Sequence, residues 1–228
     1  MKLQRDRILF EDNHIIAINK HAGELSQSDD TGDTSLEDTV RVYIKEKYNK
    51  PGNVFLQAVH RLDRPVSGVM LFARTSKAVE RMTGLLRERE VKKIYWAVVK
   101  QKPPKLHDEL IHYLKRIETK NITKAIHAPT SDAKESKLTY RILKSADKYF
   151  QIEIMLETGR HHQIRVQLSE IGCPIVGDVK YGYAAPLPDA SIALHARKIE
   201  FIHPIKKEPI VIEATPPRSP IWKRFDSR

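Results

Sequence analysis

Alternation of apolar and polar residues in the middle of the chain restricts its fold more than any other feature. From residue 150 to 156 every second side chain is a large apolar one, as in a strand with one buried face. Residues 137–143 precede this run across a turn at 145–148, which predicts an antiparallel pair. A wholly apolar run at 69–73 predicts a strand that is covered on both faces. Further strands are predicted at residues 8–10, 15–18, 93–99, 198–202 and 209–213.

Three helices are predicted between these strands. Thr34 and Glu37 form a capping box ahead of apolar residues at helical spacing, and that helix ends before Pro51. A second helix follows with Ser76 as its N-cap, and a third spans 161–170. Strands outnumber helices and no repeat or linker is visible. The sequence therefore predicts an α+β fold, with one large mixed and mostly antiparallel sheet in a single domain over residues 1–228.

The chain carries a strong positive charge, with 40 Lys and Arg against 29 Asp and Glu in 228 residues and a formal net charge of +11. An excess of this kind favours a polyanionic partner, and nucleic acid is the preferred interpretation over a basic surface kept for solubility. Membrane binding is disfavoured, because there is no spanning apolar run and no basic amphipathic helix.

One cysteine, Cys173, excludes an intrachain disulfide and a thiolate-rich zinc site. The first residues lack the apolar stretch of a signal peptide, so a cytoplasmic location is expected. The histidines form no metal-binding pair, and His60 and His195 are expected to be structural hydrogen-bonding groups. No metal site is predicted.

Two segments have the residues for chemistry. Residues 60–68 connect two strands, and Asp63 lies there between Arg61 and Arg64. Nearby cations favour an ionised carboxylate, which could act as a nucleophile or base, while the arginines could contact phosphate or a base edge. A turn with a surface ion pair is the alternative interpretation.

The second segment, residues 158–165, joins a strand to the third predicted helix, where free backbone N–H groups favour an anion. His161 and Arg165 are four residues apart and are expected to share one helix face, either in a cleft or toward solvent. Tyr95 and Trp96 could stack on a base, although packing within a sheet is the favoured interpretation of these aromatic residues.

Six ordered blocks of residues, spanning about 8–214, resemble the RluA-type RNA pseudouridine synthases, without the N-terminal S4 domain that some relatives have. HRLDRPVSG at 60–68 resembles the family signature HRLDR-x-T-S-G. The other blocks lie at 19–23, 93–97, 158–166, 177–182 and 194–204. The sequence departs from the family pattern at His21, Val66 and Gln167, none of which is a residue assigned to catalysis.

The resemblance implies a pseudouridine synthase fold with a central basic active-site cleft, and isomerisation of uridine in RNA without metal or organic cofactor. It assigns Asp63 as the essential aspartate, Tyr95 as the residue packed against the base, and Arg165 as the partner of Asp63. Arg61 matches the residue that takes the place of the flipped nucleotide. Whether Asp63 attacks C1′ or removes the C2′ proton is left open.

Contacts with RNA are further predicted for Lys20, Arg64 and Arg160, with Asn19 at the rim of the site. The expected state is a monomer without an obligatory protein partner, acting on ribosomal RNA in preference to transfer RNA. A binding protein that has lost activity is the alternative function, and a metal-dependent nuclease is disfavoured because Asp63 has no acidic neighbour within ten residues on either side. Residues 215–228 are a tail to which no role is assigned.

Overall fold

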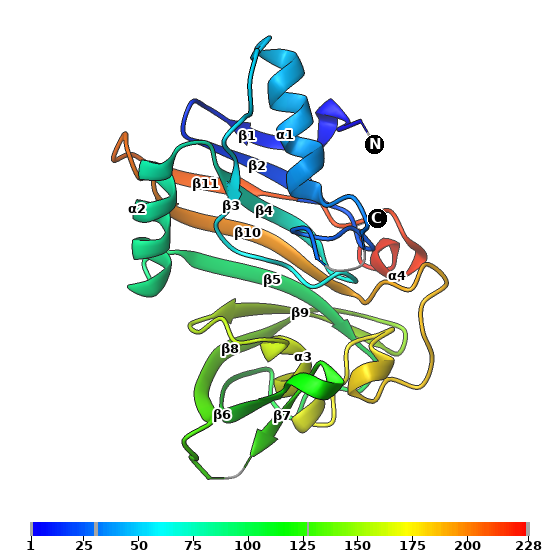
Figure 1. The fold of residues 1–228 in the computed structure, drawn as a ribbon. Helices are drawn as coiled ribbons and strands as arrows, with labels where there is room; N and C mark the ends of the chain where they lie inside the picture. The colour runs from blue at the N-terminus through cyan, green and yellow to red at the C-terminus, as the bar shows by residue number, and fades with distance from the viewer. Residues whose placement is uncertain (1, 30–31, 127, 227–228) are drawn as a thin grey trace. The chain divides into compact units, whose positions relative to one another are not determined.

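The computed structural model describes residues 2–29, 32–126 and 128–226, which fold as two compact units (Figure 1). The first unit contains Met1–Val91 and Ala196–Pro216, and the second contains Lys92–His195 and Pro217–Arg228. The second unit is thus formed mainly by one continuous segment, which is inserted between the two segments of the first unit. A single catalytic domain over residues 1–228 stays a prediction.

In the residues that the structure describes, the first unit combines an antiparallel sheet with two helices. Strand β4 pairs with β2 and with the short β3, β2 pairs with β1, and β10 pairs with β11, all in antiparallel register. The strands are β1 (Ile8–Glu11), β2 (Ile15–Lys20), β3 (Gln57–Ala58), β4 (Ser67–Ala73), most of β10 (Leu194–Ile202) and β11 (Pro209–Glu213), and the helices are α1 (Leu36–Lys47) and α2 (Ser76–Arg87), with a 3-10 turn at Arg5–Arg7. All seven residues of β4 are buried, which confirms the strand predicted from the apolar run.

Both helices of the first unit begin one residue away from the predicted caps. In α1 the capping box is formed by Ser35 and Asp38, not by Thr34 and Glu37. In α2 the cap is Thr75, whose hydroxyl accepts the Ala78 N–H at 3.2 Å, and Ser76 is already helical. Neighbouring residues of the same type compete for the cap, and the packing of the helix selects between them.

The described residues of the second unit form strands paired in the order β5-β9-β8-β6-β7, antiparallel throughout. They are β5 (Lys92–Val99), β6 (His107–Ile117), β7 (Ile122–Ile126), β8 (Ala133–Ala146) and β9 (Tyr149–Leu156), accompanied by α3 (Gln163–Glu170), α4 (Pro220–Lys223) and 3-10 turns at Glu118–Lys120 and Val179–Tyr181. The predicted pairing of 137–143 with 150–156 is confirmed by the register of β8 on β9.

Helix α3 is shorter than the predicted span from 161 to 170. It begins at Gln163, because His162 has φ +52° and lies in the left-handed region ahead of the first turn. It ends at Glu170 with Ile171 as its C-cap, and the φ of +74° at Gly172 allows the N–H groups of residues 172 and 173 to bond back to the carbonyls of 169 and 168.

The predicted α+β class, with mostly antiparallel strands and flanking helices, is confirmed. Among the helices in the described part of the chain, none is long and apolar enough to cross a membrane.

Candidate active site

The segment with Asp63 is a loop of the first unit between β3 and β4. A turn closes where the Val66 N–H donates to the Asp63 carbonyl at 3.0 Å. His60 Nε2 accepts the Leu71 N–H at 3.1 Å, which confirms the predicted structural role of His60. The Asp63 side chain is half-buried and that of Arg61 is exposed.

The ammonium of Lys20, at the end of β2, fixes the backbone of this loop. It donates to the carbonyl of Val66 at 2.7 Å, to those of Arg64 and Asp63 at 3.2 and 3.3 Å, and to that of His21 at 3.1 Å. The side chain is 0% exposed. These bonds differ from the predicted contact of Lys20 with RNA, because an ammonium turned inward onto carbonyl groups does not reach a phosphate.

Burial also perturbs the titration of Lys20. Desolvation lowers the pKa of its amine to about 8, against the opposing effect of the Glu24 and Asp63 carboxylates. Arg7 and Arg64 add to the lowering of the pKa, because each is a like charge.

We expect Lys20→Met to destabilise the first unit by about 1–3 kcal/mol at pH 7, because the loop carbonyls lose a shared donor. Between pH 8 and about 10, unfolded lysine holds a proton that the folded side chain has released. Unfolding then takes up a proton, so the wild type gains stability relative to the variant as the pH rises, by about 2–3 kcal/mol.

Urea unfolding of both proteins at pH 7, 8.5 and 10 measures this difference. Lys45→Met, at an exposed position of α1, is the matched control and should shift stability by less than about 0.5 kcal/mol. If the stability of the wild type and of Lys20→Met changed in parallel with pH, the lowered pKa of Lys20 would be contradicted.

A second set of contacts links the loop to Gly23, Ser26 and Asp33. The Ser26 hydroxyl donates to the Leu62 carbonyl at 2.7 Å and accepts the Leu62 N–H at 3.1 Å. Arg64 accepts the Gly23 N–H through its carbonyl at 2.7 Å and donates to the Gly23 carbonyl through Nε at 3.0 Å. Its guanidinium is also paired with Asp33 at 2.8 Å, and both side chains remain about half exposed. Contact of Arg64 with RNA stays a prediction.

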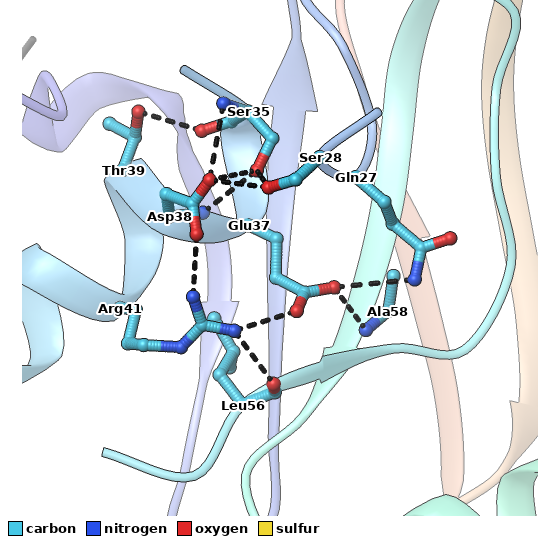
Figure 2. A network of polar contacts seen from close by, with 9 residues as sticks. All are labelled: Gln27, Ser28, Ser35, Glu37, Asp38, Thr39, Arg41, Leu56 and Ala58. Carbon is cyan, nitrogen blue, oxygen red and sulfur yellow. Dashed lines mark hydrogen bonds and ion pairs between the residues drawn. The ribbon is translucent and has the colours of Figure 1, made fainter. Parts of the chain in front are cut away.

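The N-terminal turn of α1 holds the segments that lead into these contacts (Figure 2). Asp38 accepts from the hydroxyls of Ser28 and Ser35, both at 2.7 Å. Glu37 accepts the Ala58 N–H at 3.1 Å, and Arg41 donates to the Leu56 carbonyl at 3.3 Å. The first turns of α1 thus hydrogen-bond the backbone of residues 56 and 58, just before the Asp63 loop.

In the second unit, Arg165 on α3 has a carboxylate partner that the sequence analysis missed. Its Nε and Nη2 donate to the two oxygens of Asp178 at 2.7 and 2.8 Å, with the side chains 5% and 1% exposed. The guanidinium also lies over the Tyr181 ring, 5.0 Å from its centroid. The signal was the family block at 177–182, for which the sequence analysis assigned no role to Asp178. The predicted pairing of Arg165 with Asp63 stays a prediction.

Polar contacts continue from Tyr181 to β7. Its hydroxyl accepts the Thr123 N–H at 2.9 Å and bonds His162 Nδ1 at 2.7 Å. His161 stacks on His162 with 3.7 Å between ring centroids, and its Nδ1 lies 2.8 Å from the Thr123 hydroxyl. Because His161 precedes α3, it does not share a helix face with Arg165, contrary to the prediction.

Residues 158–163 form a loop that its own side chains organise. Gln163 Oε1 accepts the Thr158 hydroxyl at 2.8 Å and the Arg160 N–H at 3.0 Å. The exposed Arg160 side chain donates to the Glu135 carbonyl at 3.4 Å. Its contact with RNA stays a prediction.

Tyr95 lies on β5 opposite Ile154 of β9 and is buried. Trp96 points to the other face, where its indole N–H donates to Glu153 at 3.3 Å. Trp96 therefore has the sheet-packing role, while Tyr95 stays the candidate for the base. No cluster of His, Cys, Asp and Glu with metal-binding geometry occurs within residues 2–29, 32–126 and 128–226.

Comparison with known proteins supplies the family. A model described as RNA pseudouridylate synthase matches residues 14–170. A protein of Bacillus subtilis named an uncharacterized RNA pseudouridine synthase is 33% identical over 91% of this chain and 67% of its own length. Ribosomal large subunit pseudouridine synthase C of Rickettsia prowazekii is 31% identical over 95% of this chain and 70% of its own length.

Solved structures agree on the fold. Human RNA pseudouridylate synthase domain containing 4 has a TM-score of 0.78 at 24% identity, covering 93% of this chain and 89% of its own. Human RNA pseudouridylate synthase domain containing 1 has a TM-score of 0.73 at 22% identity, with 96% and 88% covered. The pseudouridine synthase fold that the sequence predicted is confirmed.

Proposed function

Because the chain belongs to the RNA pseudouridylate synthase family, we propose that it converts a uridine of large-subunit ribosomal RNA to pseudouridine, with Asp63 as its catalytic carboxylate. Family membership supplies the activity. The name of the Rickettsia relative supports the choice of RNA, and transfer RNA is the second candidate substrate.

The observation that carries the role of Asp63 is the way its loop is held. Lys20 and Ser26 bond the backbone of residues 62–66 from opposite ends, which fixes the origin of the Asp63 side chain. A site that must place one oxygen against a ribose needs this kind of rigid support.

The reaction breaks the N1–C1′ bond, turns the uracil, joins C5 to C1′ and transfers the C5 proton. Asp63 begins it either by attack on C1′ or by removal of the C2′ proton. The nucleotide must first leave its stack. We assign Arg61 to the vacated place in the RNA, Tyr95 to the base, and Arg165 to the charge and orientation of Asp63. Arg64 and Arg160 are assigned to the phosphates.

The +11 charge supports binding of RNA by the catalytic domain itself. We further propose that the protein acts as a cytoplasmic monomer, without an obligatory protein partner, metal or organic cofactor.

Mapping pseudouridines in total RNA by carbodiimide primer extension, from cells with and without the gene, tests the proposal. Loss of at least one stop in large-subunit ribosomal RNA, restored by the wild-type gene, is expected. Loss of stops in transfer RNA alone would move the substrate there, and an unchanged map would favour the binding protein without activity.

A further inference from the structure

Lys93 places a charge on the apolar face of the second unit's sheet. Paired residues of antiparallel strands share a face, and β5 pairs Lys93 with Leu156 and Tyr95 with Ile154. Tyr95 and Ile154 are buried, and Lys93 itself is half-buried. Two residues of strand, about 6.6 Å, separate the lysine from the candidate base-binding tyrosine on the same side.

The amine of Lys93 makes no hydrogen bond or ion pair within the part of the chain that the structure describes, and desolvation alone lowers its pKa. Partial desolvation of an ammonium that has no protein partner strengthens its attraction for an anion that can reach it. Lys93 is therefore suited to bind an anion or another strong acceptor.

The surroundings leave room for such a ligand. A Cβ added at Gly159 would come within 3.2 Å of Lys93 Nζ, so the amine lies against a stretch of backbone that has no side chain. Gly159 is exposed, and the guanidinium-bearing Arg160 follows it directly. The half-buried Lys93 therefore lies beside exposed backbone at Gly159, next to a second basic residue.

We propose that Lys93 Nζ binds a phosphodiester oxygen of the RNA next to the target uridine, with Tyr95 on the base. This inference rests on the proposed function. Phosphate is favoured over the uracil ring, because the lysine lies two residues along the strand from Tyr95, and an anion offsets the desolvation that lowers the pKa of the amine.

Binding of a 20-nucleotide oligouridylate to the full chain, measured by fluorescence anisotropy across KCl concentrations, tests the contact without a cost for base flipping. For Lys93→Ala we expect affinity to fall about tenfold, the size of one charge-assisted bond. The slope of log Kd against log[KCl] should decrease by about 0.7, the value for one phosphate on a single strand.

Lys93→Arg keeps the cation and should retain both affinity and slope. Lys100→Ala is the matched control, since it removes the same charge from an exposed position just beyond the other end of β5 and should leave the slope unchanged. An unchanged slope in Lys93→Ala overturns the proposal. Unchanged Kd with lost turnover would instead make Lys93 a proton-transfer group and likewise overturn it.

A different measurement shows whether the proposed function itself is wrong. If the wild type forms no pseudouridine in ribosomal or transfer RNA, the function is wrong, while the oligouridylate slopes still decide whether Lys93 contacts phosphate.

Discussion

Asp63→Asn should abolish pseudouridine formation and leave the fold unchanged. We expect turnover to fall by at least about a thousandfold, because the amide can neither attack C1′ nor accept the C2′ proton. Release of tritium from RNA labelled at uridine C5 measures turnover directly, since C5 loses its hydrogen as the C5–C1′ bond is completed.

The fold should tolerate this change, since asparagine keeps the size of the side chain and the loop keeps the contacts made by the backbone of Asp63. Its carbonyl accepts from Lys20 and from the Val66 N–H. Asp33→Asn is the matched control, because it removes an exposed carboxylate paired with Arg64 in the same unit and should change turnover by less than about threefold. Turnover near the wild-type rate in Asp63→Asn would remove Asp63 from the mechanism and leave family membership intact.

Local pattern was enough to predict most strands and the class of fold. Period-two alternation identified β9 and its pairing with β8, and continuous apolarity identified β4. The start of α3 could not be predicted, because a left-handed histidine at 162 carries no distinctive sequence signal. The His162 ring contacts Tyr181 and His161, and the first of these lies nineteen residues away, beyond the reach of local pattern.

Lys20 shows that a sequence can place a charged residue in a functional segment and still give the wrong role for its side chain. A lysine beside Asn19 and His21 in a basic chain indicates surface and RNA. Its burial depends on carbonyl groups more than forty residues away, which converge only when the Asp63 loop closes over the end of β2. The motif identified the loop as functional. Sequence spacing could not predict that the buried Lys20 ammonium would hydrogen-bond the loop carbonyls.

Asp178→Asn should destabilise the second unit strongly. The bidentate pair with Arg165 has both side chains almost fully buried, and removing one partner of such a pair costs about 3–5 kcal/mol. Thermal or urea unfolding of the variant measures the loss. Asp147→Asn, which breaks the exposed pair with Arg224 in the same unit, is the matched control and should cost less than about 1 kcal/mol.

A double variant separates stability from chemistry. In Arg165→Met with Asp178→Leu both charges are gone and the volume is largely kept, so much of the lost stability should return. Turnover should not return, because the proposed role of Arg165 beside Asp63 needs the guanidinium. If the double variant regained both stability and pseudouridine formation, Arg165 would be a structural residue of the second unit, and the charge and orientation of Asp63 would have to come from another group.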